Sequence, residues 1–532
     1  MTRPSPRRLS EVVTTFMLEG LHVPAARMRV THCASLRCRV HCTWARWTGR
    51  RVSEHPWPVG VRMALTKLGP AFVKIGQILS VRTDLAPAEL AQELHSLQSE
   101  VPPVPFDQIR ETVEREMGKA LDEAFIRFDA EPLAAGSVAQ VHVAELPSGE
   151  KVAIKVKRPG IDETVTEDLQ ILVWLAERME RFLPAARPYR PVAAARELAE
   201  YTRRELDFRN EAEVGREVGR RFESWEDVRV PTVHHGSRDL IVMDFVDGFP
   251  MDDVEAMERQ GIDPHALMQR GLEAVLAQIF EFGLFHADPH PGNLHVTPEG
   301  EIVLLDFGIF GRVDDRMRRD CALLMWALGR GDVDLASYFL LRMARVEPGA
   351  DVAAFREEVE ARYRAWHGKS VAEYGFAKLV YEEITLGARH GLVFPSNTVL
   401  LGKALVTMEG VVLAVDPSMD LSKEAEPFLG RLKEQLFSMD RLREGLERSL
   451  PIWWDLAERL PLGAAELLER GVWPTAAPAE AAAAPRDRAV VWAAVVVVGG
   501  LCLASSLPPV ASGWSIPGVA LVLLGLVGAV RW

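Results

Sequence analysis

The segment HADPHPGNLHVTPEGEIVLLDFG at residues 286–308 constrains this chain more than any other part of it. Asp288 is followed five residues later by Asn293, and Asp306 comes thirteen residues after Asn293. The residues between Asn293 and Asp306 read as two short apolar strands joined by a Pro-Glu-Gly turn. Because a hairpin brings its two ends together, we expect Asn293 and Asp306 to lie side by side, with oxygen ligands that suit a hard cation.

Protein kinases use this spacing to hold Mg-ATP: one Asp faces the acceptor, and an Asn and a second Asp bind the metal. Taken alone, Asp306 is more typical of a strand-end Asp that caps a turn, so only the joint pattern favours a nucleotide site. The pattern predicts that Asp288 orients the acceptor and that Asn293 and Asp306 hold Mg²⁺.

Three further parts of an ATP site are expected upstream of this segment. Lys155 ends a VAIK sequence on the second of two predicted antiparallel strands, the position of the Lys that binds the α and β phosphates. Glu211 lies on a helix predicted over 193–222, from which it can pair with Lys155. An apolar strand follows, and its backbone from Met243 to Phe245 is expected to face adenine.

These features predict an α+β, two-lobed protein-kinase-like fold with an N-terminal helical extension, a mostly helical C-lobe and a C-terminal transmembrane hairpin. The expected parts are a basic N-terminal arm at 1–60, the helical extension at 61–125, the N-lobe at 126–247, the C-lobe at 248–470, a Pro/Ala linker at 471–488 and the transmembrane hairpin at 489–531.

The charge of the chain is acidic overall and basic at one end. It has 62 Lys and Arg against 75 Asp and Glu, a net charge of −13, which argues against a general nucleic-acid binder. Residues 1–62 hold eleven Arg, three Glu and no Lys or Asp, so this arm either lies on anionic lipid or is a solvated leader. The arm also holds a cluster that fits no standard zinc spacing, and no metal is expected there: His32, Cys33, Cys38, His41 and Cys42.

The C-terminal tail has the composition of membrane helices. Residues 489–507 carry no charge and would span about 28 Å as a helix, close to the thickness of a bilayer. Residues 516–530 are again uncharged. Arg486, Arg488 and Arg531 flank the pair, which places both ends and the body in the cytoplasm. The alternative is a buried helix pair of a soluble protein.

Four signatures stand in order along the chain: LGPAFVKIGQILSVRTDLAP, LAAGSVAQVH, ELDFRNEA, and HADPHPGN with DFG. With them the chain resembles the ABC1/AarF/UbiB atypical kinase family from about residue 60 to 420, and its tail is similar to that of bacterial UbiB. The eukaryotic members are the mitochondrial quinone-biosynthesis kinases. The resemblance implies ATP and Mg²⁺ as cofactors, a role in isoprenoid-quinone biosynthesis and a bacterial inner-membrane location.

The resemblance also implies a helical lid over the site. Lys74 and Gln77 are three residues apart and share one helix face, with Lys74 directed at Glu205 and Asp207. Such a lid would exclude a protein substrate, and Glu205 and Asp207 are expected to have different roles. Without the family match, surface charges on a solvated helix would be the favoured interpretation.

The expected phosphate loop departs from ordinary kinases, because it has no G-x-G-x-x-G. It offers instead Ala134, Ala135, Gly136 and Ser137. The family often has a third alanine where Gly136 stands. No APE element follows the DFG triplet, and HRD is replaced by His-Ala-Asp, so a peptide-docking activation loop is not expected.

The preferred interpretation is a membrane-anchored Mg-ATP enzyme that hydrolyses ATP or transfers phosphate to a small acceptor, with Lys155, Glu211 and Asp288 as its principal residues. Expected partners are the lipid membrane, quinone intermediates and quinone-biosynthesis enzymes. One alternative is an ATP-binding scaffold or lipid-extraction factor with little turnover, and another is a true protein kinase.

Overall fold

The computed structural model describes residues 5–19, 55–81, 88–94, 96–97, 102–182, 191–366, 375–436, 447 and 449–451. Met1–Phe437 form one compact unit and Ser438–Trp532 a second, and the elements described below lie in the first. The Cys/His cluster at 32–42, the linker at 471–488 and the predicted membrane hairpin at 489–531 lie outside the described residues.

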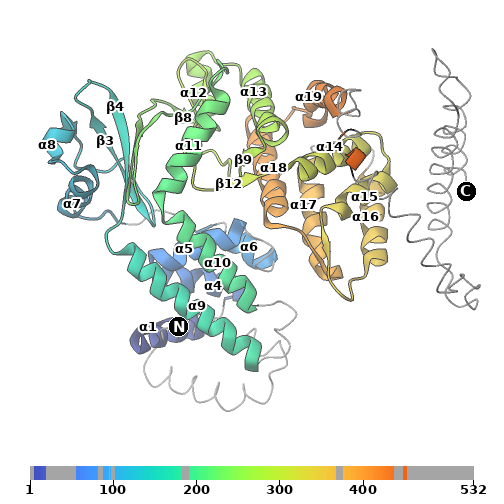
Figure 1. Cartoon of the computed structure of the whole chain (residues 1–532), viewed down its shortest axis with the longest axis horizontal. Coiled ribbons are helices and arrows are strands. Elements are labelled where there is room, and N and C mark those ends of the chain that lie inside the picture. Colours follow the sequence, from blue (N-terminus) through green and yellow to red (C-terminus); the bar gives the residue numbers. More distant parts are fainter. Residues whose placement is uncertain are drawn as a thin grey trace, which may run out of the picture. The chain divides into compact units, whose positions relative to one another are not determined.

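A six-stranded antiparallel sheet forms the N-lobe, in the order β1-β3-β4-β7-β6 with β2 paired to β3. Figure 1 shows its central strands β3 and β4 beside α7 (Phe106–Met117) and α8 (Leu121–Ala124). Its strands are β1 (Arg127–Phe128), β2 (Ala134–Ala135), β3 (Ala139–Glu145), β4 (Lys151–Lys157), β6 (Val233–Gly236) and β7 (Leu240–Asp244). The turn between β3 and β4 contains Gly149 with a φ of 91°, a conformation that glycine adopts without strain. The predicted pair of strands around VAIK is therefore confirmed.

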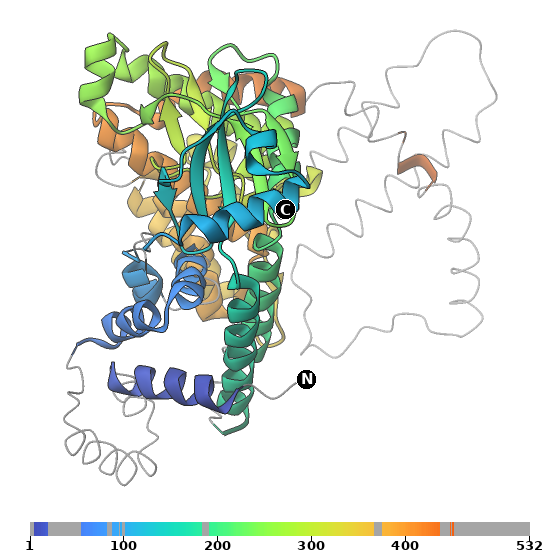
Figure 2. The ribbon, with the colours of Figure 1, turned by 90° about the vertical axis from the view of Figure 1, so that its left-hand side faces the viewer.

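Helices cover both faces of this sheet, because successive residues of a strand point to opposite sides. Helix α7 (Phe106–Met117) lies across one face (Figure 2), where Ile109 and Val113 pack against Ile154. Helix α11 (Phe208–Phe222) packs on the other face, where Ala212 meets Met243 in a second buried cluster. The short helix α8 (Leu121–Ala124) follows α7.

The extension predicted over 61–125 is divided, because α7 and α8 pack with the N-lobe sheet, whereas the helices before them join α9 (Ile161–Phe182) and α10 (Pro191–Glu205) in a separate helical cluster with its own core. This cluster consists of α1 (Pro6–Leu18), α4 (Trp57–Leu68), α5 (Pro70–Val81), α6 (Ala88–Leu94), α9 and α10. Phe72, Ile75 and Leu169 are buried within it. Arg8 ties α1 to α9, since its Nε and Nη2 donate to the two oxygens of the fully buried Asp168 at 2.8 and 3.0 Å.

The C-lobe is mainly helical and contains three small sheets. Its helices are α12 (Val254–Gln260), α13 (Pro264–Ala277), the π-helix η2 (Gln278–Phe282), α14 (Asp315–Gly329), α15 (Val333–Arg342), α16 (Val352–Trp366), α17 (Phe376–Gly387), the 3-10 turn η3 (Ala388–His390), α18 (Ser396–Val415) and α19 (Leu421–Leu436). Its strands are β5 (Val228–Arg229), β8 (Phe249–Pro250), β9 (Leu284–His286), β10 (Leu294–Val296), β11 (Ile302–Leu304), β12 (Phe310–Arg312), β13 (Arg345–Val346) and β14 (Leu392–Val393).

One predicted helix is divided in the structure. The helix expected over 193–222 is broken between α10 and α11, because Asp207 takes an extended conformation and accepts a hydrogen bond from the Arg209 amide as the N-cap of α11. Helix α7 ends at Met117, where Gly118 adopts a left-handed φ of 66°, and the chain continues into α8 and β1. The α+β, kinase-like architecture itself is confirmed.

Among the described residues, one helix is long and apolar enough to cross a membrane by length and composition. This is α18, and 67% of its most apolar 18-residue stretch is buried inside the protein. It packs against α13 and α17, as a core helix does. Its sequence is apolar because it lies inside the C-lobe, where two buried charged residues, Lys403 and Glu409, interrupt it.

Candidate active site

Strands β10 and β11 form the predicted hairpin. Leu294 pairs with Leu304, and the Leu305 amide donates to the Asn293 carbonyl at 3.1 Å. Asn293 and Asp306 therefore leave the same end of the hairpin, as the sequence indicates. The prediction of their geometry is confirmed, whereas their roles as metal ligands stay a prediction.

Lys155 lies between two carboxylates contributed by different lobes. Its Nζ is 2.5 Å from Glu211 Oε1 on α11 and 3.6 Å from Asp306 Oδ1 after β11. Glu211 is almost fully buried, and the Gly308 amide donates to Asp306 Oδ1 at 2.9 Å. The structure thus contains the predicted Lys155–Glu211 ion pair and adds Asp306 to it.

Helix α5 brings a second lysine to the same place. Lys74 forms an ion pair with Glu205, the last residue of α10, and it also interacts electrostatically with Asp306 and Lys155. The helical extension therefore covers the side of the site that holds Asp306. Gln77 lies one turn further along α5 and is half-buried.

The prediction that Lys74 points at both acids of the ELD triplet is wrong for Asp207. Its carboxylate accepts hydrogen bonds from the Arg209 side chain at 2.9 and 2.6 Å and from the Arg209 amide. These hydrogen bonds hold the pKa of Asp207 below its usual range. Asp207 starts α11 and so positions Glu211, whereas Glu205 faces Lys74, which agrees with the expectation of different roles.

The charges of Lys155 and Asp306 stabilise each other. Burial lowers the pKa of Lys155, but the carboxylates of Asp306 and Glu211 outweigh burial, and the pKa lies above its usual value. Partial desolvation raises the pKa of Asp306, but Lys155, the Gly308 amide and Lys74 together bring it well below the usual range. Lys155 is therefore an ammonium and Asp306 a carboxylate at neutral pH, as phosphate binding and metal binding require.

Asp288 is held by the loop that follows β9. Its backbone amide donates to His286 Nδ1 at 3.1 Å, and its carbonyl accepts from Asn293 Nδ2 at 3.1 Å. Burial lowers the pKa of His286 to about 4, so the imidazole is neutral and accepts at Nδ1. Because Asn293 donates through its nitrogen, its amide oxygen is the atom that remains for a metal.

The predicted phosphate loop is a tight turn into β3. The Gly136 amide donates to the Ala139 carbonyl at 2.8 Å, and Arg158 Nε donates to the Gly136 carbonyl at 2.8 Å. Ala134 and Ala135 form β2, and Ser137 is buried. Gly136 has no left-handed φ, and a Cβ there would meet the Ala139 oxygen at an ordinary 3.5 Å, so alanine would fit.

The predicted adenine-binding backbone lies on the same side of the sheet as Lys155. Met243 pairs with Ala153, and Ala153 and Lys155 are two residues apart on β4, so all three face α11. After β7 the Phe245 amide donates to the Lys151 carbonyl at 3.0 Å, and Lys151 Nζ lies 3.7 Å from the Phe245 ring centroid. The end of β7, with the segment 243–245, therefore lies beside the part of β4 that carries Lys155.

The donor set fits a magnesium ion that shares its coordination with phosphate. No group of three or more His, Cys, Asp or Glu that could hold a metal occurs in the described part of the chain. Asp306 is 43% exposed, and Glu205 Oε2 is buried without a hydrogen-bond partner among the described residues. A site with one or two carboxylates, an amide oxygen and phosphate oxygens suits Mg²⁺, which keeps several waters.

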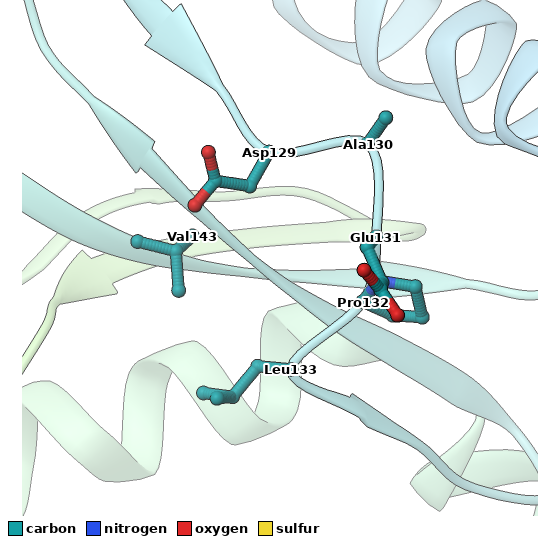
Figure 3. A pocket seen from close by; sticks show the side chains of 6 residues that line it. All are labelled: Asp129, Ala130, Glu131, Pro132, Leu133 and Val143. Carbon is teal, nitrogen blue, oxygen red and sulfur yellow. The ribbon is translucent and has the colours of Figure 1, made fainter.

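One surface hollow lies away from Lys155, Glu211 and Asp306. Its volume is about 400 Å³, and it is open to solvent between the β1–β2 connection and β3 (Figure 3). Its lining consists of Asp129, Ala130, Glu131, Pro132, Leu133 and Val143. None of the predicted site residues is among them, so the candidate active site is identified by its charges and hydrogen bonds.

Sequence reasoning did not find Lys403. Its Nζ donates to Asp288 Oδ1 at 3.0 Å from helix α18, and the residue is only 4% exposed. The sequence did contain an indication of its burial, since Lys403 and Glu409 are the only charged residues among the twenty residues of α18. A lysine in such a run predicts a buried acidic partner, although not which one.

Comparison with known proteins agrees with this geometry. The ABC1 atypical kinase-like domain matches residues 96–337, and the UbiB helical domain matches residues 360–420. The "Probable protein kinase UbiB" of Azotobacter vinelandii is 32% identical over 88% of both chains. Its namesake in Marinobacter nauticus is 31% identical over 75% of this chain and 74% of that protein.

One solved structure, the complex of Rv3197 with erythromycin from Mycobacterium tuberculosis, is 20% identical and has a TM-score of 0.48, with 68% of this chain and 93% of that chain covered. The sequence relatives cover most of this chain at more than 30% identity, and both parts of the kinase-like body match family domains. The chain therefore belongs to the ABC1/UbiB family of atypical kinase-like proteins, and this membership implies ATP binding.

Proposed function

We propose that this chain is a membrane-anchored, Mg-ATP-dependent enzyme that hydrolyses ATP or transfers its terminal phosphate to a small acceptor. The observation that carries the proposal is the position of Lys155 between Glu211 and Asp306, beside the hairpin that bears Asn293. Lys155 as an ammonium and Asp306 as a carboxylate have the charges that phosphate binding and metal binding need.

Each residue then has one task. Lys155, oriented by Glu211, binds the α and β phosphates, and Asp306 with Asn293 holds Mg²⁺. The bound metal supplies charge neutralisation on the phosphates. Asp288 orients the acceptor hydroxyl or a water molecule. Positioning and electrostatic stabilisation are the main contributions of a protein to this chemistry. A pure scaffold would not need both a metal-binding carboxylate and an acceptor-orienting one.

The helical extension favours a small acceptor over a folded protein. Lys74 and Glu205 pair next to Asp306, so α5 lies where a protein substrate would have to approach. The relatives are named probable protein kinases, and a protein acceptor is the second candidate function. Transfer of labelled phosphate to an added protein, but not to water or a lipid extract, would favour that second candidate.

Mg-ATP is expected to stabilise the folded chain, because the nucleotide binds only when both lobes are formed. At about 100 times its Kd it should raise the free energy of unfolding by about 2.7 kcal/mol. Thermal unfolding of the purified full chain, with ATP and either Mg²⁺ or EDTA, measures this effect. Phosphate release under the same conditions measures turnover.

The outcomes separate the candidate functions. Stabilisation together with Mg-dependent phosphate release supports the enzyme. Stabilisation without release would favour an ATP-binding scaffold or lipid-extraction factor. The absence of any stabilisation by Mg-ATP would contradict a nucleotide site altogether.

The membrane anchor and the link to isoprenoid-quinone biosynthesis are supported by the uncharged segments at 489–507 and 516–530 and by family analogy. Cells that lack this chain are expected to lose quinone and to regain it with the full chain. A form that ends at residue 485 should leave the membrane fraction and restore less quinone. If it sediments with membranes as firmly as the full chain, the basic arm at 1–62 becomes the next candidate anchor.

A further inference from the structure

Helix α18 reaches the candidate active site from outside the segment that carries the kinase-type motifs. The ABC1 domain match ends at residue 337, whereas α18 spans Ser396–Val415. Its two charged residues have different surroundings. Glu409 accepts hydrogen bonds from the amides of Ala377 and Lys378 and so caps the start of α17. Lys403 instead points at Asp288.

Four hydrogen bonds to described residues fix Asp288, and only one of them acts on its side chain. The backbone amide donates to His286 Nδ1, and the carbonyl accepts from Asn293 Nδ2 and from the His290 amide. The carboxylate is bound by Lys403, whose Nζ lies 3.0 Å from Oδ1. His290 Nε2 lies 4.0 Å from Oδ2, which is beyond hydrogen-bond range. Lys403 thus orients the carboxylate through Oδ1, and Oδ2 has no hydrogen bond to the described residues.

We propose that Lys403 is a positioning residue for phosphoryl transfer: its ammonium holds Asp288 Oδ1 so that Oδ2 can orient the acceptor. This inference rests on the proposed function. In the step concerned, the acceptor oxygen bonds to the terminal phosphorus and the bond to ADP breaks. ADP keeps the electron pair, and the acceptor proton passes by way of Asp288 to phosphate or solvent.

The burial of Lys403 explains why this contact is specific. A lysine that is 4% exposed needs a carboxylate partner, because an unpaired ammonium inside a protein is costly. Asp288 is 21% exposed, so one side of the pair is fixed in the core and the other faces the site. A purely structural lysine would affect stability, whereas a positioning lysine also affects the turnover number.

The test compares variants of the full chain in Mg-dependent ATP turnover. Lys403→Met is expected to lower kcat about 50-fold with KM for ATP changed less than threefold, because a misplaced acceptor costs rate rather than nucleotide affinity. Lys403→Arg keeps the charge and should recover most of the rate. Lys423→Met is the matched control: Lys423 forms a 3.2 Å pair with Asp420 and is 78% exposed, and its loss should leave kcat unchanged.

A double variant decides whether Lys403 acts through Asp288. In an Asp288→Asn background, Lys403→Met should lower kcat less than threefold further, since the partner is already lost. If the double variant lowers kcat by the product of the two single effects, the inference is overturned. An unchanged kcat in Lys403→Met would also overturn it. If Lys403→Met does not fold, Lys403→Arg and Lys403→Gln replace it, and equal kcat values for these two would likewise overturn the inference.

The two proposals fail in different ways. If the wild-type chain shows no Mg-dependent turnover, the proposed function falls and this inference falls with it. If the wild type turns over ATP and Asp306→Asn does not, while Lys403→Met keeps the wild-type rate, the enzyme stands and only the role of Lys403 is rejected.

Discussion

Replacement of Asp306 by Asn is expected to lower the Mg-dependent turnover of ATP by about 10³-fold, a loss of about 4 kcal/mol in transition-state stabilisation. The amide has nearly the shape of the carboxylate and can still accept from the Gly308 amide at Oδ1. It lacks the negative charge that faces Lys155 at 3.6 Å and that we propose as a ligand of Mg²⁺. The loss should therefore fall on chemistry and metal affinity rather than on folding.

The measurement is steady-state phosphate release over a range of Mg²⁺ concentrations. The control is Asp253→Asn, because Asp253 is the N-cap of α12, and asparagine caps a helix as well as aspartate does. That variant should keep the wild-type rate. If Asp306→Asn retains more than a tenth of the activity, the metal and the phosphates are not bound at this cluster.

Replacement of Lys155 by Met is expected to destabilise the fold as well as to abolish turnover. It leaves the Glu211 side chain, which is 6% exposed, without the ammonium at 2.5 Å. Removal of one partner of a buried ion pair costs about 3 kcal/mol, because the remaining charge is uncompensated. Chemical denaturation of Lys155→Met against the wild type gives the difference in free energy of unfolding.

A second variant separates the two effects of Lys155. In the double variant Lys155→Met, Glu211→Gln, no unpaired carboxylate remains at position 211. Most of the lost free energy of unfolding should therefore return, while ATP turnover stays absent. Equal instability of the single and the double variant would show that packing around the lysine stem, and not the buried carboxylate, accounts for the loss.

The parts of the site that are local in sequence were predictable. Asn293 and Asp306 belong to one hairpin, and Lys155 belongs to one strand pair, so periodicity and turn residues fix their geometry. The pairing of Lys155 with Glu211 spans 56 residues and was predictable only through the kinase pattern.

The parts that depend on packing between distant elements were missed. The break between α10 and α11 has no Pro or Gly to mark it, and the N-cap Asp207 reads as one more charge on a charged helix. Lys403 lies 115 residues from Asp288, and no local pattern connects them. Only the burial of α18 against the C-lobe directs that lysine to the site.

The position of α18 also determines where the chain can be divided to make fragments or chimaeras. A fragment that ends at residue 337 would keep every kinase-type signature, yet it would lose Lys403 and more than half of the buried core that joins Leu276 and Phe285 to Leu400 and Leu401. Chimaeras between members of the family should therefore exchange the whole stretch through Val415. A junction placed earlier would combine Asp288 from one protein with the α18 of another, so the hydrogen bond between Asp288 and Lys403 would depend on two chains that were not matched.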